Sequence, residues 1–289
     1  MIHNSETNSD SAPILVIGST GKTGRRIVQR LTDLGYAVRG GSRRSSPAFD
    51  WDDRSTWAEA LRGVEVAYIS FFPDLAVPGA PAAIGALVEV AEREGVKRLV
   101  LLTGRGEANA ESCEAIVRSS GLGFTIIRAS WFNQNFSEGH LIEPVFQGVL
   151  AIPAGAVREP FVDVDDIADV AVAALTEDGH DGELYEVTGP RLLSFAEVAS
   201  ALSDAVGWEI RYAAITSEQF RDGLTAEAGP EFANMLTDLC AEVLDGRNEW
   251  LGDGVQRALG RAPRDFAEYC RDAAASGAWA SHACAGERG

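Results

Sequence analysis

The sequence predicts an α/β fold, a doubly wound parallel sheet with a smaller mixed α/β region toward the C-terminus. Three observations lead to it. An apolar run at residues 14–17 leads directly into three glycines, Gly18, Gly21 and Gly24. A helix-like stretch from Arg25 follows these glycines, and strand-like and helix-like segments then alternate along the middle of the chain. A strand, a glycine-rich turn and a helix in this order form a phosphate cradle.

The glycine loop has the spacing G-x-x-G-x-x-G, and each glycine has its own task. Gly18 permits the tight turn, Gly21 lets a pyrophosphate approach the backbone, and Gly24 lets the helix pack on the strand. The start of that helix favours an anion through its N–H groups and its dipole. The loop residues expected to contact a cofactor are Gly18, Ser19, Thr20, Gly21, Lys22, Thr23 and Gly24. Because Lys22 lacks the G-x-x-x-x-G-K-[ST] spacing of a nucleotide-triphosphate loop, a Rossmann-like dinucleotide site is the better match.

The type of dinucleotide is indicated at the end of a second expected strand, within residues 36–44. An NAD site places an acidic residue there to bind the ribose hydroxyls. This chain has Ser42 and Arg43 instead, and no acid before Asp50. A guanidinium pairs with a 2′-phosphate, so we expect NADP(H) with Arg43 as the main contact and Ser42 assisting. Asp50 and Trp51 lie where an adenine would bind, although Trp51 fits a core aromatic equally well.

Further contacts are expected where strands end, because ligands of such sheets bind beyond the carboxyl ends of the strands. Helices are predicted at 53–61, 81–94 and 108–120, and strands at 64–71, 96–103 and 124–128. The strand ends add Ser70, Phe71, Phe72 and Thr103 to the expected cofactor contacts.

The C-terminal half predicts more helix than strand. Residues 161–171 begin a helix with acids in its first turn, where Asp165 or Asp166 is expected to be the cap. Ser194 and Glu197 have the spacing of a capping box. We expect a flexible leader at 1–12, a nucleotide-binding domain at 13–160 with returning elements from 161–190, a mainly helical substrate-binding region at 191–275, and a flexible tail at 276–289.

Composition narrows the classes of protein. The 289 residues are 46% hydrophobic and 24% charged, with a net charge of −18 that would repel nucleic acid. No apolar run reaches the roughly 18–20 residues that span a bilayer, and the polar N-terminus lacks the core of a signal peptide. Four scattered cysteines have no metal-binding spacing. We therefore expect reduced thiols, no metal, no membrane and a cytoplasmic location.

Several motifs together resemble the NmrA-like family of atypical short-chain dehydrogenases. They are G-S-T-G-K-T-G at 18–24, F-D-W at 49–51, G-V-K-R-L-V-L-L at 95–102, I-R-A-S-W-F-N-Q-N-F at 127–136 and F-V-D-V-D-D-I-A at 161–168. Within the family, G-S-R at 41–43, F-D-W and W-F-x-x-N-F are similar to the ergot-alkaloid reductases, the festuclavine and agroclavine dehydrogenases. The resemblance covers residues 13–280 and implies an NADPH-dependent reductase or a cofactor-sensing regulator, without fixing a substrate.

The chain lacks the Tyr-Lys pair, four residues apart, that most short-chain dehydrogenases use. None of its five tyrosines is followed by a lysine at that distance, and neither Lys22 nor Lys97 substitutes for it. Reduction of a simple ketone needs a proton donor near the carbonyl oxygen. An iminium, a quinone or a conjugated carbonyl needs mainly a positioned hydride and a suitable electrostatic environment.

Three residues are candidates for catalysis, each with a plainer alternative. Thr103 could orient a substrate or be an ordinary strand residue. Glu107 could be an acid or begin a helix, and His140 could take part in catalysis or be solvated. The expected substrate contacts are Trp131, Phe132, Asn133 and Phe136, with one of the aromatic residues in the core.

Three functions stay open on this basis. We favour an NADPH-dependent reductase of secondary metabolism that acts on a small planar or aromatic acceptor, as a monomer or a homodimer. The alternative is an NADP(H)-sensing regulatory or binding protein without turnover, which the missing Tyr-Lys pair favours. A non-redox member, such as an epimerase or a scaffold, is the third.

Overall fold

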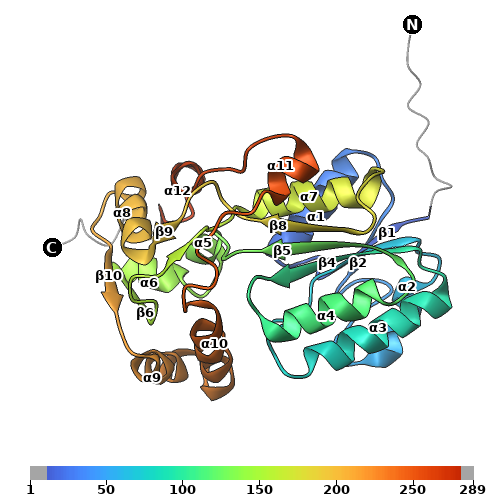
Figure 1. The fold of residues 1–289 in the computed structure, drawn as a ribbon, viewed down its shortest axis with the longest axis horizontal. Helices are drawn as coiled ribbons and strands as arrows, with labels where there is room; N and C mark the ends of the chain where they lie inside the picture. Colours follow the sequence, from blue (N-terminus) through green and yellow to red (C-terminus); the bar gives the residue numbers. More distant parts are fainter. Residues whose placement is uncertain (1–11, 281–289) are drawn as a thin grey trace, which may run out of the picture. The chain divides into compact units, whose positions relative to one another are not determined.

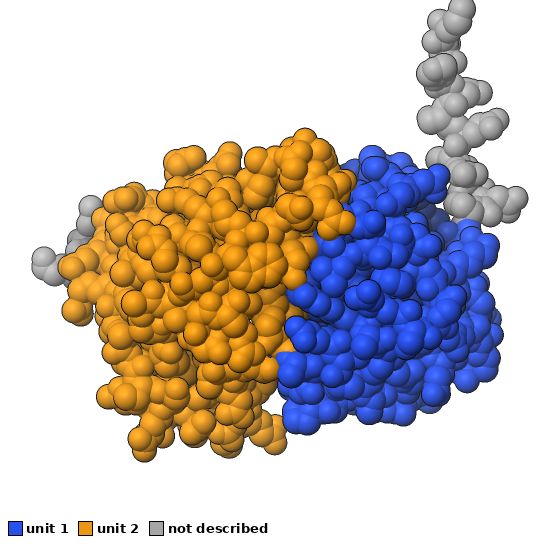
Figure 2. Space-filling model, in the orientation of Figure 1, with its two compact units in different colours: residues 1–103, 108–128, 167–185 blue, residues 104–107, 129–166, 186–289 orange. Residues whose placement is uncertain are grey.

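The computed structural model describes residues 12–280, so the expectations for 1–11 and 281–289 lie outside the described residues. The chain divides into two compact units (Figure 2). Unit 1 comprises the chain up to residue 103 together with 108–128 and 167–185, and unit 2 comprises 104–107, 129–166 and the chain from 186 onward.

A six-stranded sheet forms the centre of unit 1, with the order β2-β1-β3-β4-β5-β8. The strands are β1 (Ile14–Ile17), β2 (Val38–Gly41), β3 (Val66–Ile69), β4 (Arg98–Gly104), β5 (Gly123–Ala129) and β8 (Glu183–Val187). β1 pairs in parallel with both β2 and β3, and β3 pairs in parallel with β4. The chain thus leaves β1 toward β2 and returns on the other side at β3. This reversal is the topological switch point at which ligands of doubly wound sheets bind, and it confirms the predicted fold class.

Helices cover both faces of this sheet (Figure 1). They are α1 (Lys22–Asp33), α2 (Trp57–Leu61) with the 3-10 turn η1 (Arg54–Thr56) before it, α3 (Ala80–Glu94), α4 (Ala108–Arg118) and α7 (Val164–Thr176). α1 and α7 lie on one face, where Arg30 pairs with Asp169 at 2.8 Å, and α3 and α4 lie on the other. Every residue of β1 is buried, as expected for a parallel strand covered on both faces.

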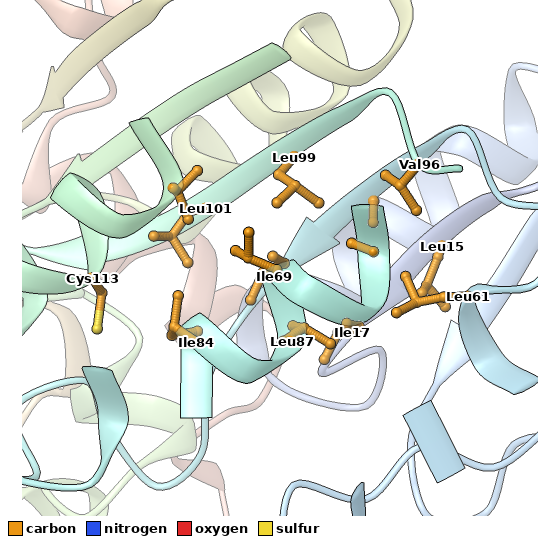
Figure 3. Packing of buried hydrophobic residues seen from close by; sticks show 14 of the residues in the cluster. Leu15, Ile17, Leu61, Ile69, Ile84, Leu87, Val96, Leu99, Leu101 and Cys113 are labelled. Atoms are coloured by element: carbon orange, nitrogen blue, oxygen red, sulfur yellow. The ribbon is translucent and has the colours of Figure 1, made fainter. Parts of the chain in front are cut away.

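The core under α3 and α4 joins strand and helix side chains (Figure 3). Leu15, Ile69 and Leu101 of the strands pack in one cluster with Ile84 of α3 and Cys113 of α4. This core holds β1, β3 and β4 against α3 and α4.

Unit 2 has its own core and two short strand pairs. β6 (Val149–Ile152) is parallel to β10 (Arg211–Ala214), and β7 (Arg158–Glu159) is antiparallel to β9 (Leu193–Ser194). Its helices are α5 (Asn135–Glu138), α6 (Ile142–Gln147), α8 (Phe195–Val206), α9 (Ser217–Ala228), α10 (Pro230–Val243), α11 (Gly254–Leu259) and α12 (Phe266–Ala275). The predicted capping box of Ser194 and Glu197 is present at the start of α8. Within residues 12–280, no helix has the length and apolar character needed to cross a membrane.

Two local expectations are corrected by the structure. The side chain that caps α7 belongs to Asp163, whose Oδ1 accepts a hydrogen bond from the Asp165 nitrogen at 2.8 Å. Asp166 is instead fully buried and pairs with Arg261 at 2.7 Å. Trp279 lies within the range expected as a flexible tail, yet it is buried and its Nε1 donates to the Phe136 carbonyl at 2.9 Å.

Candidate functional site

The glycine loop between β1 and α1 is closed too tightly for side chains. Gly18 has φ 78°, a left-handed conformation that favours glycine. A β-carbon on Gly24 would lie 2.1 Å from the Gly18 carbonyl oxygen, and one on Gly21 would lie 3.2 Å from the same atom. The Gly18 nitrogen donates to the Gly41 carbonyl at 2.9 Å, which ties the loop to the end of β2. The loop can close in this way only with glycine at these positions, as the predicted dinucleotide loop requires.

The start of α1 carries no negative group of its own. Gly21 is the N-cap, no side chain caps the helix, and no acidic residue lies in its first turn. A helix start of this kind favours an anion. Together with the closely packed glycines, it could hold the pyrophosphate of a dinucleotide.

The end of β2 is equally restricted. A β-carbon on Gly40 would lie 3.1 Å from the Ser19 hydroxyl, and one on Gly41 would lie 2.9 Å from the Ile17 α-carbon. Arg43 follows on the exposed turn, and its guanidinium forms no ion pair within the described part of the chain. Ser42 shares a hydrogen bond with Ser45 between their hydroxyl oxygens at 2.8 Å.

Aromatic residues gather after β2 and β3. The half-buried Trp51 ring lies 5.0 Å from Phe49 and 4.6 Å from Phe71, centroid to centroid, and it packs against the core. Its packing role is therefore observed, and its contact with an adenine stays a prediction. Phe72 is 70% exposed. The Asp50 carbonyl accepts a hydrogen bond from Trp57 Nε1 at 2.6 Å.

Two further side chains lie beside the glycine loop. Ser70 is close enough that its Cβ would be 3.0 Å from a β-carbon on Gly18. Tyr68 is buried and donates to the Thr23 hydroxyl at 2.8 Å. Burial raises the pKa of Tyr68 above its usual value, so its hydroxyl stays protonated and supports Thr23.

Thr103, the next-to-last residue of β4, belongs to a buried polar group. Its Oγ1 donates to Glu114 Oε1 at 2.8 Å, and Arg128 Nε donates to the same oxygen at 2.8 Å. Sequence reasoning missed the roles of Glu114 and Arg128. The available signal was spacing, because Ala110, Cys113, Glu114 and Val117 share the buried face of α4.

In unit 2, the Glu107 side chain folds back over Gly104, the last residue of β4. A β-carbon on Gly104 would lie 1.7 Å from its Oε1, and the residue is only 7% exposed. The candidate His140 is half-buried, with its ring 6.2 Å from that of Phe232. Glu107 and His140 belong to unit 2 and Thr103 to unit 1.

Arg105 is a buried residue that sequence reasoning did not single out. Its Nε donates to Glu186, and a second nitrogen donates to the Ser130 hydroxyl at 3.1 Å. The guanidinium also lies 4.1 Å from the ring centroid of Trp250, a cation–π contact. The Arg105 side chain thus joins Ser130, Glu186 and Trp250 within unit 2.

Glu159 is a buried acid of unit 2 whose pKa is raised. It has no exposed surface, and neither carboxyl oxygen has a hydrogen-bond partner among the described residues. Burial raises the pKa of Glu159 from 4.5 to about 8; Arg105 opposes this rise, and Glu249 and Asp245 add to it. The side chain is therefore largely protonated at neutral pH.

The predicted substrate contacts, all in unit 2, differ in how deeply they are buried. Trp131 is half-buried, with its ring 6.0 Å from Phe195, and the half-buried Phe132 bridges to Val162. Phe136 is completely buried in the core, with no surface left for a ligand.

Asn133 is also fully buried, and its amide nitrogen and oxygen both lack partners within residues 12–280. Such an unsatisfied amide is costly. Its contact with a substrate stays a prediction.

Known proteins resemble the chain over most of its length. The model of the NmrA-like family matches residues 10–270. An NAD(P)H azoreductase of Xenophilus azovorans is 33% identical, covering 91% of this chain and 98% of the relative. An agroclavine dehydrogenase of Claviceps fusiformis is 30% identical, covering 90% and 96%. The crystal structure of an NADPH-dependent quinone oxidoreductase of Escherichia coli has a TM-score of 0.75 at 20% identity, covering 90% and 98%. The predicted resemblance is confirmed.

Proposed function

Because the chain belongs to the NmrA-like family, we propose that it is an NADPH-dependent oxidoreductase that transfers hydride to an activated small-molecule acceptor. The acceptor is an imine or iminium, a quinone or a conjugated carbonyl compound. Relatives named as an NAD(P)H azoreductase and an agroclavine dehydrogenase support oxidoreductase chemistry.

The observation that carries the cofactor assignment is the approach of Gly24 to the Gly18 carbonyl oxygen. A β-carbon on Gly24 would be 2.1 Å from that atom, so only glycine lets α1 begin directly over the end of β1. Bound NADPH supplies the hydride. The loop backbone binds its pyrophosphate, and Arg43 with Ser42 binds the 2′-phosphate.

We choose an activated acceptor because the chain lacks the usual proton donor for a ketone. No tyrosine is followed by lysine four residues later. Tyr68 is a weak acid that already donates to Thr23. An acceptor that is electron-poor before it binds depends less on a proton from the protein. The chain's own residues then need only to bind, orient and exclude water.

Binding and turnover test the proposal separately. Calorimetry should detect NADPH binding that is tighter than NADH binding. Loss of NADPH absorbance should follow addition of at least one member of a panel containing a cyclic imine, a naphthoquinone, an azo dye and an enone. Absence of any heat with NADPH would overturn the cofactor assignment.

A second function has one specific observation in its favour. The Thr103 hydroxyl hydrogen is already donated to Glu114, so Thr103 supplies no proton to an acceptor. A protein that senses NADP(H) without turnover would need none. Tight NADPH binding with no turnover of the panel would favour this function over the reductase.

A further inference from the structure

The Thr103 hydroxyl donates its single hydrogen to Glu114. Thr103 is 3% exposed at the end of β4, and its Oγ1 lies 2.8 Å from Glu114 Oε1. A threonine hydroxyl has one hydrogen to donate and two lone pairs that accept. When the hydrogen is directed to Glu114, only the lone pairs can serve another partner.

Arg128 determines that direction. Its Nε donates to Glu114 Oε1 at 2.8 Å, and a second guanidinium nitrogen donates to Oε2. A guanidinium is always charged, and this two-point pairing selects the ionised carboxylate. An ionised carboxylate has no hydrogen, so Glu114 cannot donate to Thr103.

Burial makes the arrangement persistent. Glu114 is 3% exposed, on the face of α4 that also carries Cys113 and Val117. A buried carboxylate without its partner would be strongly destabilised. All three side chains belong to unit 1, and each lies on a regular element, β4, α4 or β5.

We propose that Glu114 and Arg128 are positioning residues that make Thr103 a hydrogen-bond acceptor at the carboxyl end of β4, so that the ligand group it selects is an N–H or O–H donor. The inference rests on the proposed function, because ligands of such sheets bind at this edge. Two groups could be this donor. The cofactor source is the carboxamide amino group of the nicotinamide, and the acceptor source is the N–H of a protonated imine substrate. A quinone or ketone oxygen finds no donor at Thr103.

The cofactor source is tested by calorimetry with NADPH and its 3-acetylpyridine analogue, in which a methyl group replaces the carboxamide amino group. The wild type should bind NADPH about five- to tenfold more tightly than the analogue, the worth of one hydrogen bond. Thr103→Val should bring this ratio near one, and Thr103→Ser should keep it.

Thr125→Val is the matched control. Thr125 is also buried, and its Oγ1 donates to the His180 carbonyl at 2.7 Å in the amino half of β5. This substitution removes the same atoms away from the carboxyl edge and should leave the ratio unchanged.

Glu114→Gln tests the positioning role. A glutamine amide can either accept or donate, so it no longer requires Thr103 to be the donor. The ratio of the two affinities should fall toward one. A purely structural loss would weaken both cofactors by the same factor and leave the ratio intact. Where Thr103→Val has brought the ratio near one, an intact ratio in Glu114→Gln would contradict the positioning role.

The acceptor source is tested with a matched pair of substrates, a protonated imine that carries N–H and its N-methyl iminium counterpart. If the donor belongs to the acceptor molecule, Thr103→Val leaves the cofactor ratio unchanged. It then lowers kcat/KM for the N–H substrate about five- to tenfold and spares the N-methyl one.

Two results would overturn the inference while leaving the proposed function standing. The first is that Thr103→Val binds NADPH and turns over substrate, yet changes neither the affinity ratio of the two cofactors nor the kcat/KM ratio of the two iminium substrates. The other is a selective loss of quinone reduction, since Thr103 would then be a donor. Failure of the wild type to bind NADPH would overturn the proposed function itself, and the inference with it.

Discussion

Arg105 and Glu186 form a buried ion pair in unit 2, with Arg105 Nε 2.8 Å from Glu186 Oε2 and side-chain exposures of 2% and 15%. Arg105→Met would leave this carboxylate without the guanidinium. Breaking a buried pair from one side lowers the free energy of unfolding by about 3–5 kcal/mol. Urea unfolding measures the loss.

Arg247→Met is the comparison for this pair. Arg247 pairs with Asp245 at 3.0 Å, but the side chains are 43% and 46% exposed. Loss of this exposed pair should therefore lower the free energy of unfolding much less than Arg105→Met does. Equal losses for the two variants would show that burial of Arg105 does not decide its contribution.

Gly24→Ala should damage both folding and cofactor binding. Its β-carbon would collide with the Gly18 carbonyl, which is backbone and can move only with the loop. We expect unfolding to be easier by about 1–3 kcal/mol and NADPH affinity to fall more than about tenfold. Thermal unfolding and calorimetry measure the two effects.

Gly85→Ala is the control for the glycine loop. Gly85 lies inside α3, and the nearest atom to its β-carbon would be Ile116 Cγ2 at 4.0 Å. Alanine should stabilise the helix by up to about 1 kcal/mol and leave NADPH affinity unchanged. If Gly24→Ala proves as harmless as Gly85→Ala, the loop is not a pyrophosphate cradle.

Arg43→Ala should remove the preference for NADPH over NADH. The 2′-phosphate would lose a charge-assisted contact, and the ratio of the two dissociation constants should fall by about tenfold or more. Arg44→Ala, on the same exposed turn, should leave the ratio near that of the wild type. A preference that survives Arg43→Ala would assign 2′-phosphate recognition to other residues.

Glu159→Gln should change how stability depends on pH. Below pH 4.5 the Glu159 carboxyl is protonated in both the folded and the unfolded chain, and between 4.5 and about 8 only the folded chain keeps the proton. The wild type therefore loses stability relative to the variant as pH rises through this window, by at most about 1.4 kcal/mol per pH unit. Urea midpoints of both proteins across that range measure the difference. A difference independent of pH would show that Glu159 titrates normally.

Local sequence patterns were sufficient for much of the fold. The apolar run before Gly18 predicted β1, and Ser194 with Glu197 predicted the capped start of α8, as observed. These features depend on neighbours within a few residues, which a sequence displays directly. The cap of α7 was missed because Asp163, Asp165 and Asp166 are chemically alike, and only the backbone path distinguishes them.

The sequence by itself determined the fold class, the family and the glycine loop, because these are written in short motifs with fixed spacing. Only the tertiary structure decided which polar side chains face one another. Thr103, Glu114 and Arg128 meet because β4, α4 and β5 pack together, and the charge of Arg128 then sets the direction of the Thr103 hydrogen bond. Glu159 retains its proton for a similar reason, since burial is a property of the whole fold that no single segment encodes.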